Sequence, residues 1–397
     1  MRKVYILGAC RTPIGKMGGK LSSLTAVELG TIVISEAMKR SNIPHEEVDH
    51  VYMGCAIQAG LGQNVARQVA LNAGLPVTTT AQTVNVVCGS GLDAVNSAAR
   101  LIQSGDADVV IAGGTESMSN APFLLKNARF GYRMGNPMLD SPLIDAMVQD
   151  GLWDSTNNYH MGITAENIAI KWELTRRELD EFALESQKKT DNAIKKGYFN
   201  DETVSVRIKN KKEDIIVEKD ESPRREITIE KLSELKPAFK QDGVVTAGNS
   251  SGINDGAAAV VLISEEKAKE LDVVPQAEWL GGALGGVEPS IMGIGSVAST
   301  NKLLNRMDMS IEDIDLFEVN EAFSAQSIAV KKELSIPDEK FNVNGGAIAL
   351  GHPIGASGCR ILVSLIYAMK QRNDTTGMAT LCIGGGMGCS TIIKNIR

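Results

Sequence analysis

The chain has 397 residues, a formal net charge of −7, 43% hydrophobic residues and 22% charged residues. Because single hydrophobic cores stop growing at roughly 250 to 300 residues, this length predicts two or three domains. The acidic balance argues against a nucleic-acid-binding protein, and no apolar stretch approaches the roughly 20 residues that cross a bilayer. We therefore expect a cytoplasmic protein with no nucleic-acid partner and no membrane association.

The first elements in chain order are strand-like runs that alternate with amphipathic helical patterns, which is typical of layered α/β proteins. A run at 83–87 leads into Cys88 and the small-residue turn 89–91, and a helical pattern begins at Leu92. A helix N-terminus stabilises a thiolate through its free N–H groups, so this setting predicts a nucleophilic Cys88. The alternative is a structural cysteine, because cysteine is among the most buried residue types. None of the six cysteines belongs to a C-x-x-C pair, which favours reduced thiols over disulfides or a metal site.

The turn after Cys88 also fits a different motif. Residues 89–94 match G-x-G-x-x-A, and Glu116 lies about 20 residues further on, as in a dinucleotide-binding fingerprint. This alternative predicts a nicotinamide-dependent oxidoreductase that uses the Gly89 turn. The cysteine directly before the first glycine argues against it.

A long polar segment follows, and it differs in character from the chain on both sides. It contains a clear helical pattern at 175–196, where Thr175 and Glu178 form a capping box. Insertions of this length are usually functional, so we expect a lid-like loop domain at 120–246. The first half of the chain then resumes with a buried strand at 255–263.

The two ends of the chain repeat one pattern. Residues 46–54 reappear as residues 312–320, and the strand–turn–helix–strand unit around Cys88 has its counterpart at 341–386. An internal duplication is the economical explanation. It predicts three units, which are a first half at 1–119 completed by 247–272, the inserted domain at 120–246, and a second half at 273–397.

The duplication places a histidine opposite Cys88. His352 lies in the glycine-dense turn at 345–358, the counterpart of the Cys88 turn, and the chain has only 4 histidines. A neutral imidazole can take a thiol proton near neutral pH, so His352 is the expected base. A surface histidine in a turn is the alternative.

Two further groups stand at the ends of strands in the second half. Cys382 precedes three glycines, 384–386, whose backbone N–H groups can face a developing negative charge. Asn320, which precedes Glu321, can hold a water or polarise a carbonyl. The alternatives are a core cysteine for Cys382 and a helix N-cap for Asn320.

These motifs stand together, in the same order and approximate spacing, in a known family. The chain resembles the thiolases, and within them the short-chain acetyl-CoA acetyltransferases, in Cys88-Gly89-Ser90-Gly91, Asn320-Glu321-Ala322-Phe323, Gly351-His352-Pro353 and Cys382-Ile383-Gly384-Gly385-Gly386. The resemblance covers essentially the whole chain. It implies a five-layered α/β/α/β/α fold built from two duplicated halves, with the inserted loop domain over the site.

The resemblance also implies a role for each motif. Cys88 becomes acylated, His352 activates it, and Cys382 exchanges a proton with the α-carbon of the second acetyl-CoA. One oxyanion hole combines His352 with a water on Asn320, and another combines the N–H groups of Cys88 and Gly384. Carbanion formation needs a base separate from the nucleophile, which agrees with the presence of two cysteines.

Coenzyme A and acyl-CoA are, by the same resemblance, substrates, with no permanently bound cofactor and no metal. The residues implied as their contacts are Leu152, His160, Met161, Arg224, Ala247, Ser251 and Ala322. The chain departs from the family in two places. Lys231 stands where a small polar residue is more usual, and Cys389 adds a thiol with no assigned role.

The implied function is that of an acetyl-CoA C-acetyltransferase, which reversibly condenses two acetyl-CoA to acetoacetyl-CoA and CoA through an acyl-cysteine. A 3-ketoacyl-CoA thiolase of broader chain length, acting in fatty-acid degradation, is the main alternative. A non-catalytic acyl-CoA-binding protein is a further alternative function. The resemblance also implies a homo-oligomer, either a dimer or a tetramer.

Overall fold

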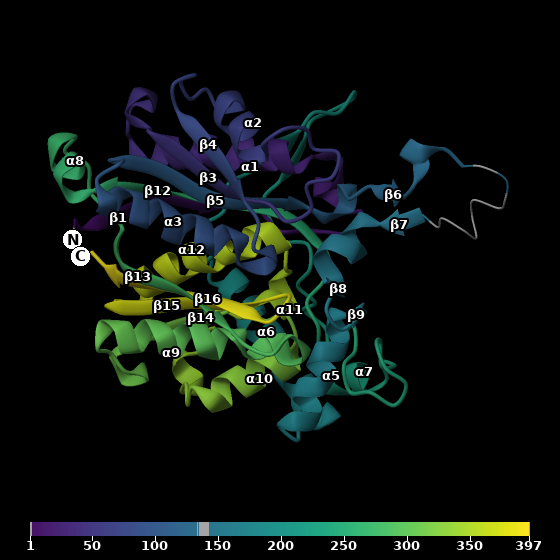
Figure 1. The fold of residues 1–397 in the computed structure, drawn as a ribbon. Helices are drawn as coiled ribbons and strands as arrows, with labels where there is room; N and C mark the ends of the chain where they lie inside the picture. Colours follow the sequence, from purple (N-terminus) through teal and green to yellow (C-terminus); the bar gives the residue numbers. More distant parts are fainter. Residues whose placement is uncertain (1, 133, 135–142, 397) are drawn as a thin grey trace.

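A computed structural model describes residues 2–132, 134 and 143–396. Two α/β halves make up the body of the molecule, one above the other in Figure 1. The elements of the first half are β1 (Val4–Arg11), β2 (Gly15–Lys16), α1 (Ala26–Ser41), β3 (His50–Gly54), α2 (Val65–Asn72), β4 (Thr80–Val84), α3 (Ser90–Ser104), β5 (Val109–Ser117), β12 (Asn254–Ser264) and α8 (Glu265–Glu270). The elements of the second half are β13 (Ala277–Gly286), α9 (Gly295–Met307), β14 (Leu316–Val319), α10 (Ser324–Glu333), α11 (Ala347–Leu350), α12 (Ile354–Arg372), β15 (Thr376–Ile383) and β16 (Met387–Asn395).

The two halves repeat one strand topology. The strand order is β4-β3-β5-β12-β1 in the first half and β14-β15-β16-β13 in the second. β3 pairs in parallel with β5, as β14 does with β15, and the later strands pair antiparallel in both halves. A parallel bridge between Phe317 and Phe341 lies where the first half has β4. This repetition confirms the predicted internal duplication.

The sheets and helices form five layers (Figure 1). α1 and α2 cover the outer face of the first sheet, α3 and α12 lie between the two sheets, and α9 and α10 cover the outer face of the second. The two sheets join at one edge, where residues 4–6 of β1 pair with residues 277–279 of β13. Every residue of α12 from Ile354 to Met369 is buried, as expected for a helix that is packed on all sides. The predicted α/β/α/β/α arrangement is confirmed.

The polar segment between the halves carries further elements that pack against both halves. β6 (Phe123–Leu125) and β7 (Leu143–Asp145) pair as an antiparallel ribbon that extends away from the body in Figure 1. α6 (Arg176–Lys195) begins at the predicted capping box of Thr175 and Glu178, and it packs on α10 and α11. The remaining elements are β8 (Trp153–Asp154), β9 (Tyr159–His160), α5 (Met161–Lys171), β10 (Val206–Ile208), β11 (Ile215–Val217) and α7 (Ile229–Ser233). Among the helices of the described ranges, none is long and apolar enough to cross a membrane.

Candidate active site

Cys88 lies in a tight turn between β4 and α3. β4 ends at Val84, earlier than the sequence predicts, and a short 3-10 helix replaces the end of the predicted strand. Val87 has a φ of 50°, a left-handed backbone conformation that is uncommon for a β-branched residue. Ser90 stabilises this turn, because its hydroxyl accepts a hydrogen bond from Val86 N at 3.0 Å and donates one to Val87 O at 2.6 Å.

Burial dominates the acidity of the Cys88 thiol. It raises the pKa of Cys88 to about 11, and the backbone N–H groups of Gly384 and of Cys88 itself offset only part of this rise. The backbone N–H groups favour the thiolate, but the loss of solvation outweighs them. Cys88 is a neutral thiol that needs a base.

His352 is buried in the counterpart turn, directly before α12. The preceding Gly351 has a φ of 111°, and Asn254 Oδ1 accepts the His352 backbone N–H at 3.0 Å. His352 Nδ1 lies 2.5 Å from Ser357 Oγ, whose hydroxyl donates to Pro353 O at 2.9 Å. Since that hydroxyl has a single hydrogen, Nδ1 carries the imidazole proton and Nε2 is free to accept another.

The charge state of His352 suits this role. Burial, and secondarily the positive charge of Arg360, lower the pKa of His352 to about 3. The imidazole is therefore neutral at physiological pH, as a base must be before it takes a proton. The resting site contains a neutral thiol and a neutral imidazole.

Asn320 follows β14 and lies against His352. Its Nδ2 atom is 3.4 Å from His352 Nε2 and 3.5 Å from Nδ1, and its Oδ1 atom accepts from Arg360 Nη2 at 3.4 Å. The alternative reading of Asn320 as a helix N-cap is wrong, because α10 begins at Ser324 with Phe323 in the capping position. The carboxamide instead lies between a buried guanidinium and the imidazole.

Cys382, near the end of β15, is the second sulfur of the site. It is fully buried, and burial, with a smaller electrostatic contribution from Cys88 when that thiol is ionised, raises the pKa of the Cys382 thiol. Gly384, two residues after Cys382, directs its backbone N–H toward Cys88.

One cavity of about 350 Å³ brings most of the predicted site residues together. Cys88, His352 and Gly384 line it, whereas Cys382 and Asn320 are buried outside its lining. All seven predicted substrate contacts also line it, namely Leu152, His160, Met161, Arg224, Ala247, Ser251 and Ala322. Sequence reasoning did not single out several other lining residues, most of which belong to no motif, namely Met118, Phe239, Ser250, Met292, Phe323 and Ile354.

His160 is held in one orientation at the start of α5. Its Nδ1 atom accepts the backbone N–H of Gly162 at 3.0 Å, and its ring stacks on Phe239 with centroids 4.7 Å apart. Burial lowers the pKa of His160, which favours the neutral ring. Because Nδ1 is an acceptor, the neutral ring carries its proton on Nε2 and offers it as a donor.

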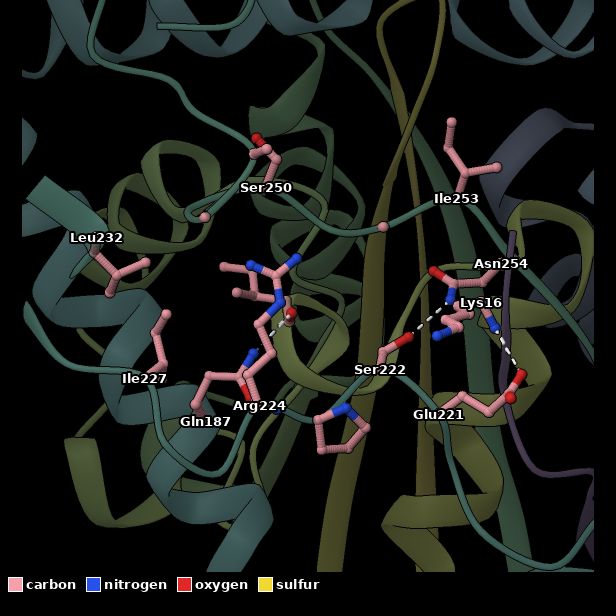
Figure 2. Close-up of a pocket in the computed structure, with 15 residues that line it drawn as sticks. Lys16, Gln187, Glu221, Ser222, Arg224, Ile227, Leu232, Ser250, Ile253 and Asn254 are labelled. Atoms are coloured by element: carbon pink, nitrogen blue, oxygen red, sulfur yellow. Dashed lines mark hydrogen bonds between the residues drawn. The ribbon is translucent and has the colours of Figure 1, made fainter. Parts of the chain in front are cut away.

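A second, more polar cavity of about 390 Å³ adjoins the first (Figure 2). Arg224 belongs to both linings, and in Figure 2 its side chain extends into the space between Ile227, Ser222 and Ser250. Its backbone N–H donates to Gln187 Oε1 at 2.8 Å. This cavity could not be predicted from the sequence, because its walls come from distant segments, with Lys16, Gln187, Glu221, Ser222 and Asn254 among them.

The dinucleotide-binding alternative does not fit the geometry. Glu116, its predicted ribose ligand, is fully buried and accepts the backbone N–H groups of Ala56, Ile57 and Gly355 at 3.0, 3.2 and 2.9 Å. At Gly91, a Cβ atom would lie 2.9 Å from the backbone N of Cys359. Gly91 therefore serves close packing of α3 against α12, and Gly89 serves close packing against Ile383 of β15.

Neither of the two residues that depart from the family pattern lines either cavity. Lys231 is exposed on α7, where its Nζ donates to Glu226 O at 3.1 Å. Cys389 is buried in β16 and accepts from Asn96 Nδ2 on α3 at 3.4 Å, so it takes part in the core between the halves. Over the part of the chain that the structure describes, no group of three His, Cys, Asp or Glu side chains could hold a metal ion.

Comparison with known proteins places this geometry in context. The family descriptions "Thiolase, N-terminal domain" and "Thiolase, C-terminal domain" match residues 4–266 and 273–395. The chain is 55% identical over 395 residues to the acetyl-CoA acetyltransferase of Syntrophomonas wolfei, with 99% of both chains covered. The crystal structure of the Bacillus anthracis acetyl-CoA acetyltransferase superimposes with a TM-score of 0.97 at 47% identity, covering 100% of this chain and 99% of that one. Human mitochondrial 3-ketoacyl-CoA thiolase superimposes with a TM-score of 0.96 at 41% identity and the same coverage.

Proposed function

The chain belongs to the thiolase family, and from this premise we propose that it is an acyltransferase that reversibly condenses two acetyl-CoA to acetoacetyl-CoA and CoA. One observation carries the proposal. Cys88, His352 and the N–H of Gly384 meet in a single cavity, and they come from the two duplicated turns and from the end of β15. A nucleophile, its base and an oxyanion donor are the parts that acyl transfer through a thioester requires.

In the first half-reaction, His352 Nε2 takes the proton of Cys88 as the sulfur attacks the thioester carbonyl of acetyl-CoA. The N–H groups of Cys88 and Gly384 stabilise the oxyanion that forms. Cys382 gives its proton to the departing CoA sulfur, so the acyl-enzyme contains an imidazolium and a Cys382 thiolate. Acylated Cys88 can no longer ionise, so its electrostatic interaction with Cys382, one of the causes that raise the pKa of Cys382, is absent from the acyl-enzyme.

In the second half-reaction, the Cys382 thiolate takes a proton from the α-carbon of another acetyl-CoA. The enolate oxygen faces the His352 Nε2–H and a water held by Asn320. The carbanion attacks the acyl carbonyl, the carbon–sulfur bond to Cys88 breaks, and Cys88 recovers its proton from His352. Every group then has its starting charge, so the cycle balances with two cysteines and one histidine.

The walls of the cavity suit the pantetheine arm and a short acyl chain. They are mainly apolar, and the donor of His160 and the guanidinium of Arg224 provide polar contacts. Arg224 also reaches the polar second cavity, where a cation can face the phosphates of CoA. Coenzyme A and acyl-CoA are substrates in this proposal, with no permanently bound cofactor.

A 3-ketoacyl-CoA thiolase of broader chain length is the second candidate, because the human enzyme of that name covers the whole chain at 41% identity. The same catalytic groups serve both reactions. The width of the acyl pocket separates them, and the pocket-lining residues Met161, Met292 and Phe323 favour the short chain because of their bulk.

We propose three structural units, at 1–119 with 247–272, at 120–246 and at 273–397, in which the middle unit covers the site. His160, Met161 and Arg224 support this division, because the polar segment supplies them to the cavity. We also propose a cytoplasmic homo-oligomer, either dimer or tetramer, that acts in fatty-acid metabolism. The exposed apolar side chains of the β6–β7 ribbon support an oligomer.

The decisive experiment combines mass spectrometry with thiolysis assays. We expect incubation with acetyl-CoA to add one acetyl group at Cys88, and thiolysis to be fastest with acetoacetyl-CoA and slower with longer 3-ketoacyl-CoA substrates. Cys88→Ser abolishes turnover while CoA binding persists, because the hydroxyl is far less acidic and less nucleophilic than the thiol. Substantial thiolysis by Cys88→Ser would refute the assignment, and equal rates over all chain lengths would favour the second candidate.

A further inference from the structure

Arg360 is a buried arginine beside the proposed catalytic groups, and no step of the proposed reaction uses it. It lies on α12, about two turns beyond His352, and it is 1% exposed. Its Nη2 atom donates to Asn320 Oδ1 at 3.4 Å. Within the described ranges, its Nε and Nη1 atoms have no hydrogen-bond partner.

Arg11 shows what a structural buried arginine looks like in the same protein. It is equally buried, but its guanidinium forms ion pairs with Glu202 at 2.5 Å and with Asp220 at 2.7 Å, and it also donates to Thr12 O. Arg360, by contrast, attracts Glu318 electrostatically without an ion pair between the two side chains in the part of the structure that is described. A buried guanidinium with so few partners costs stability, and such exceptions concentrate at functional sites.

The contact with Asn320 has a defined direction. An arginine has only donors, so the oxygen of the Asn320 carboxamide must face Arg360. The amide nitrogen then faces His352, at 3.4 Å from Nε2 and 3.5 Å from Nδ1. If the carboxamide were turned over, its N–H groups would meet the N–H groups of the guanidinium, and the imidazole would face an acceptor.

We propose that Arg360 is a positioning residue that fixes the Asn320 carboxamide with its NH2 group toward His352. This inference rests on the proposed function, in which Asn320 holds a water that donates to the enolate oxygen. A carboxamide free to turn would present its oxygen to that water for part of the time and would weaken the oxyanion hole. Arg360 therefore acts on the reaction through Asn320, without contact with the substrate.

The surroundings of Arg360 are consistent with this role. Glu318, Glu202 and Glu321 attract the guanidinium and Arg11 repels it, so the buried cluster holds charges of both signs. The same positive charge contributes to the lowered pKa of His352. One side chain thus orients the carboxamide and favours the neutral imidazole that the first step requires.

A double-mutant cycle tests the proposal in the full-length protein. We expect Arg360→Met to lower kcat for acetoacetyl-CoA thiolysis between about tenfold and hundredfold, with KM within about twofold, because orientation and not binding is lost. Arg360→Lys retains one charged donor and should recover part of kcat. In the Asn320→Ala background, Arg360→Met should change kcat by less than about twofold, because the carboxamide that Arg360 orients is then absent.

Two further variants separate positioning from folding. Ser364→Ala on the same helix removes only a hydrogen bond to Glu202, at 3.1 Å, and should leave kcat within about twofold of the original chain. Arg360→Met combined with Glu318→Gln removes the guanidinium together with the carboxyl group that attracts it, and this double variant is used if Arg360→Met alone does not fold.

Two results would overturn the proposal. They are an unchanged kcat in Arg360→Met, and an equal fall in kcat with and without Asn320. Failure of the proposed function would look different, because the unmodified chain would then lack thiolysis or Cys88→Ser would retain it.

Discussion

At the scale of single residues, the site combines a thiol and an imidazole that are both neutral at rest. Burial holds the pKa of Cys88 at about 11 and that of His352 at about 3, so neither group ionises alone near neutral pH. Proton transfer between them becomes favourable only as negative charge moves from the sulfur to the bound thioester. This arrangement protects the nucleophile from unwanted reactions while no substrate is present.

His352 should nevertheless control how fast Cys88 reacts with an electrophile. We expect His352→Ala to slow the alkylation of Cys88 by iodoacetamide at pH 7 about tenfold or more, because the thiol then lacks its general base. Tryptic mass spectrometry over a time course measures the modified fraction. His45→Ala is the matched control, since His45 contacts Gly74 O and lines neither cavity. An unchanged rate in His352→Ala would remove His352 as the activator.

The residue types of the site could be predicted from sequence, whereas their electrostatics could not. Cys88 and His352 stand in repeated glycine-rich turns, and that repetition identifies them as partners. The sign of the Cys88 pKa shift depends on how deeply α3 and α12 bury the turn, which no local motif reports. The role of Arg360 was not predictable either, because it depends on the contact with Asn320 and on the lack of hydrogen-bond partners at Nε and Nη1 within the described residues.

At the scale of elements, the meeting of α3 and α12 sets the positions of Cys88 and His352. Each residue lies just before one of these two helices, and the helices approach closely because glycines face each other across the contact. A Cβ atom at Gly91 would lie 3.0 Å from Gly355 O, and one at Gly358 would lie 2.5 Å from Leu92 N. The sequence predicted both helices but misplaced the end of β4, since the chain enters a short 3-10 helix at Val87, which has a left-handed backbone conformation.

Gly91→Ala should therefore damage activity more than stability. The added methyl group pushes α3 away from α12, which we expect to destabilise the fold by about 1–3 kcal/mol and to lower kcat at least about tenfold through displacement of the Cys88 turn. Urea unfolding gives the first quantity and acetoacetyl-CoA thiolysis the second. Ser104→Ala, at the exposed end of α3, should change neither. A fully active Gly91→Ala would show that the helix contact does not set the catalytic geometry.

At the scale of the whole molecule, the repeated pattern predicted the two halves, and the resemblance to the thiolases predicted the five layers. Each half repeats the same order of strands and helices, so the hydrophobic pattern determines the layers. The join of β1 to β13 was not predictable, because it depends on two strands that lie far apart in the chain. The walls of the polar second cavity were not predictable either, because Lys16, Gln187 and Asn254 belong to no sequence motif.

The β6–β7 ribbon offers a test of assembly that leaves the active site untouched. Phe123 and Leu125 lie on one face of β6, Leu143 pairs with Leu125 across the ribbon, and Phe123 and Leu143 are 64% and 58% exposed. An exposed apolar face of this kind favours association with another copy of the chain. We expect Phe123→Ser with Leu143→Ser to lower the mass measured by light scattering after size exclusion, while kcat per subunit stays within about twofold. Val274→Ser, at an apolar residue 85% exposed outside the ribbon, should leave the mass unchanged, and an unchanged mass in the ribbon variant would exclude the ribbon from the interface.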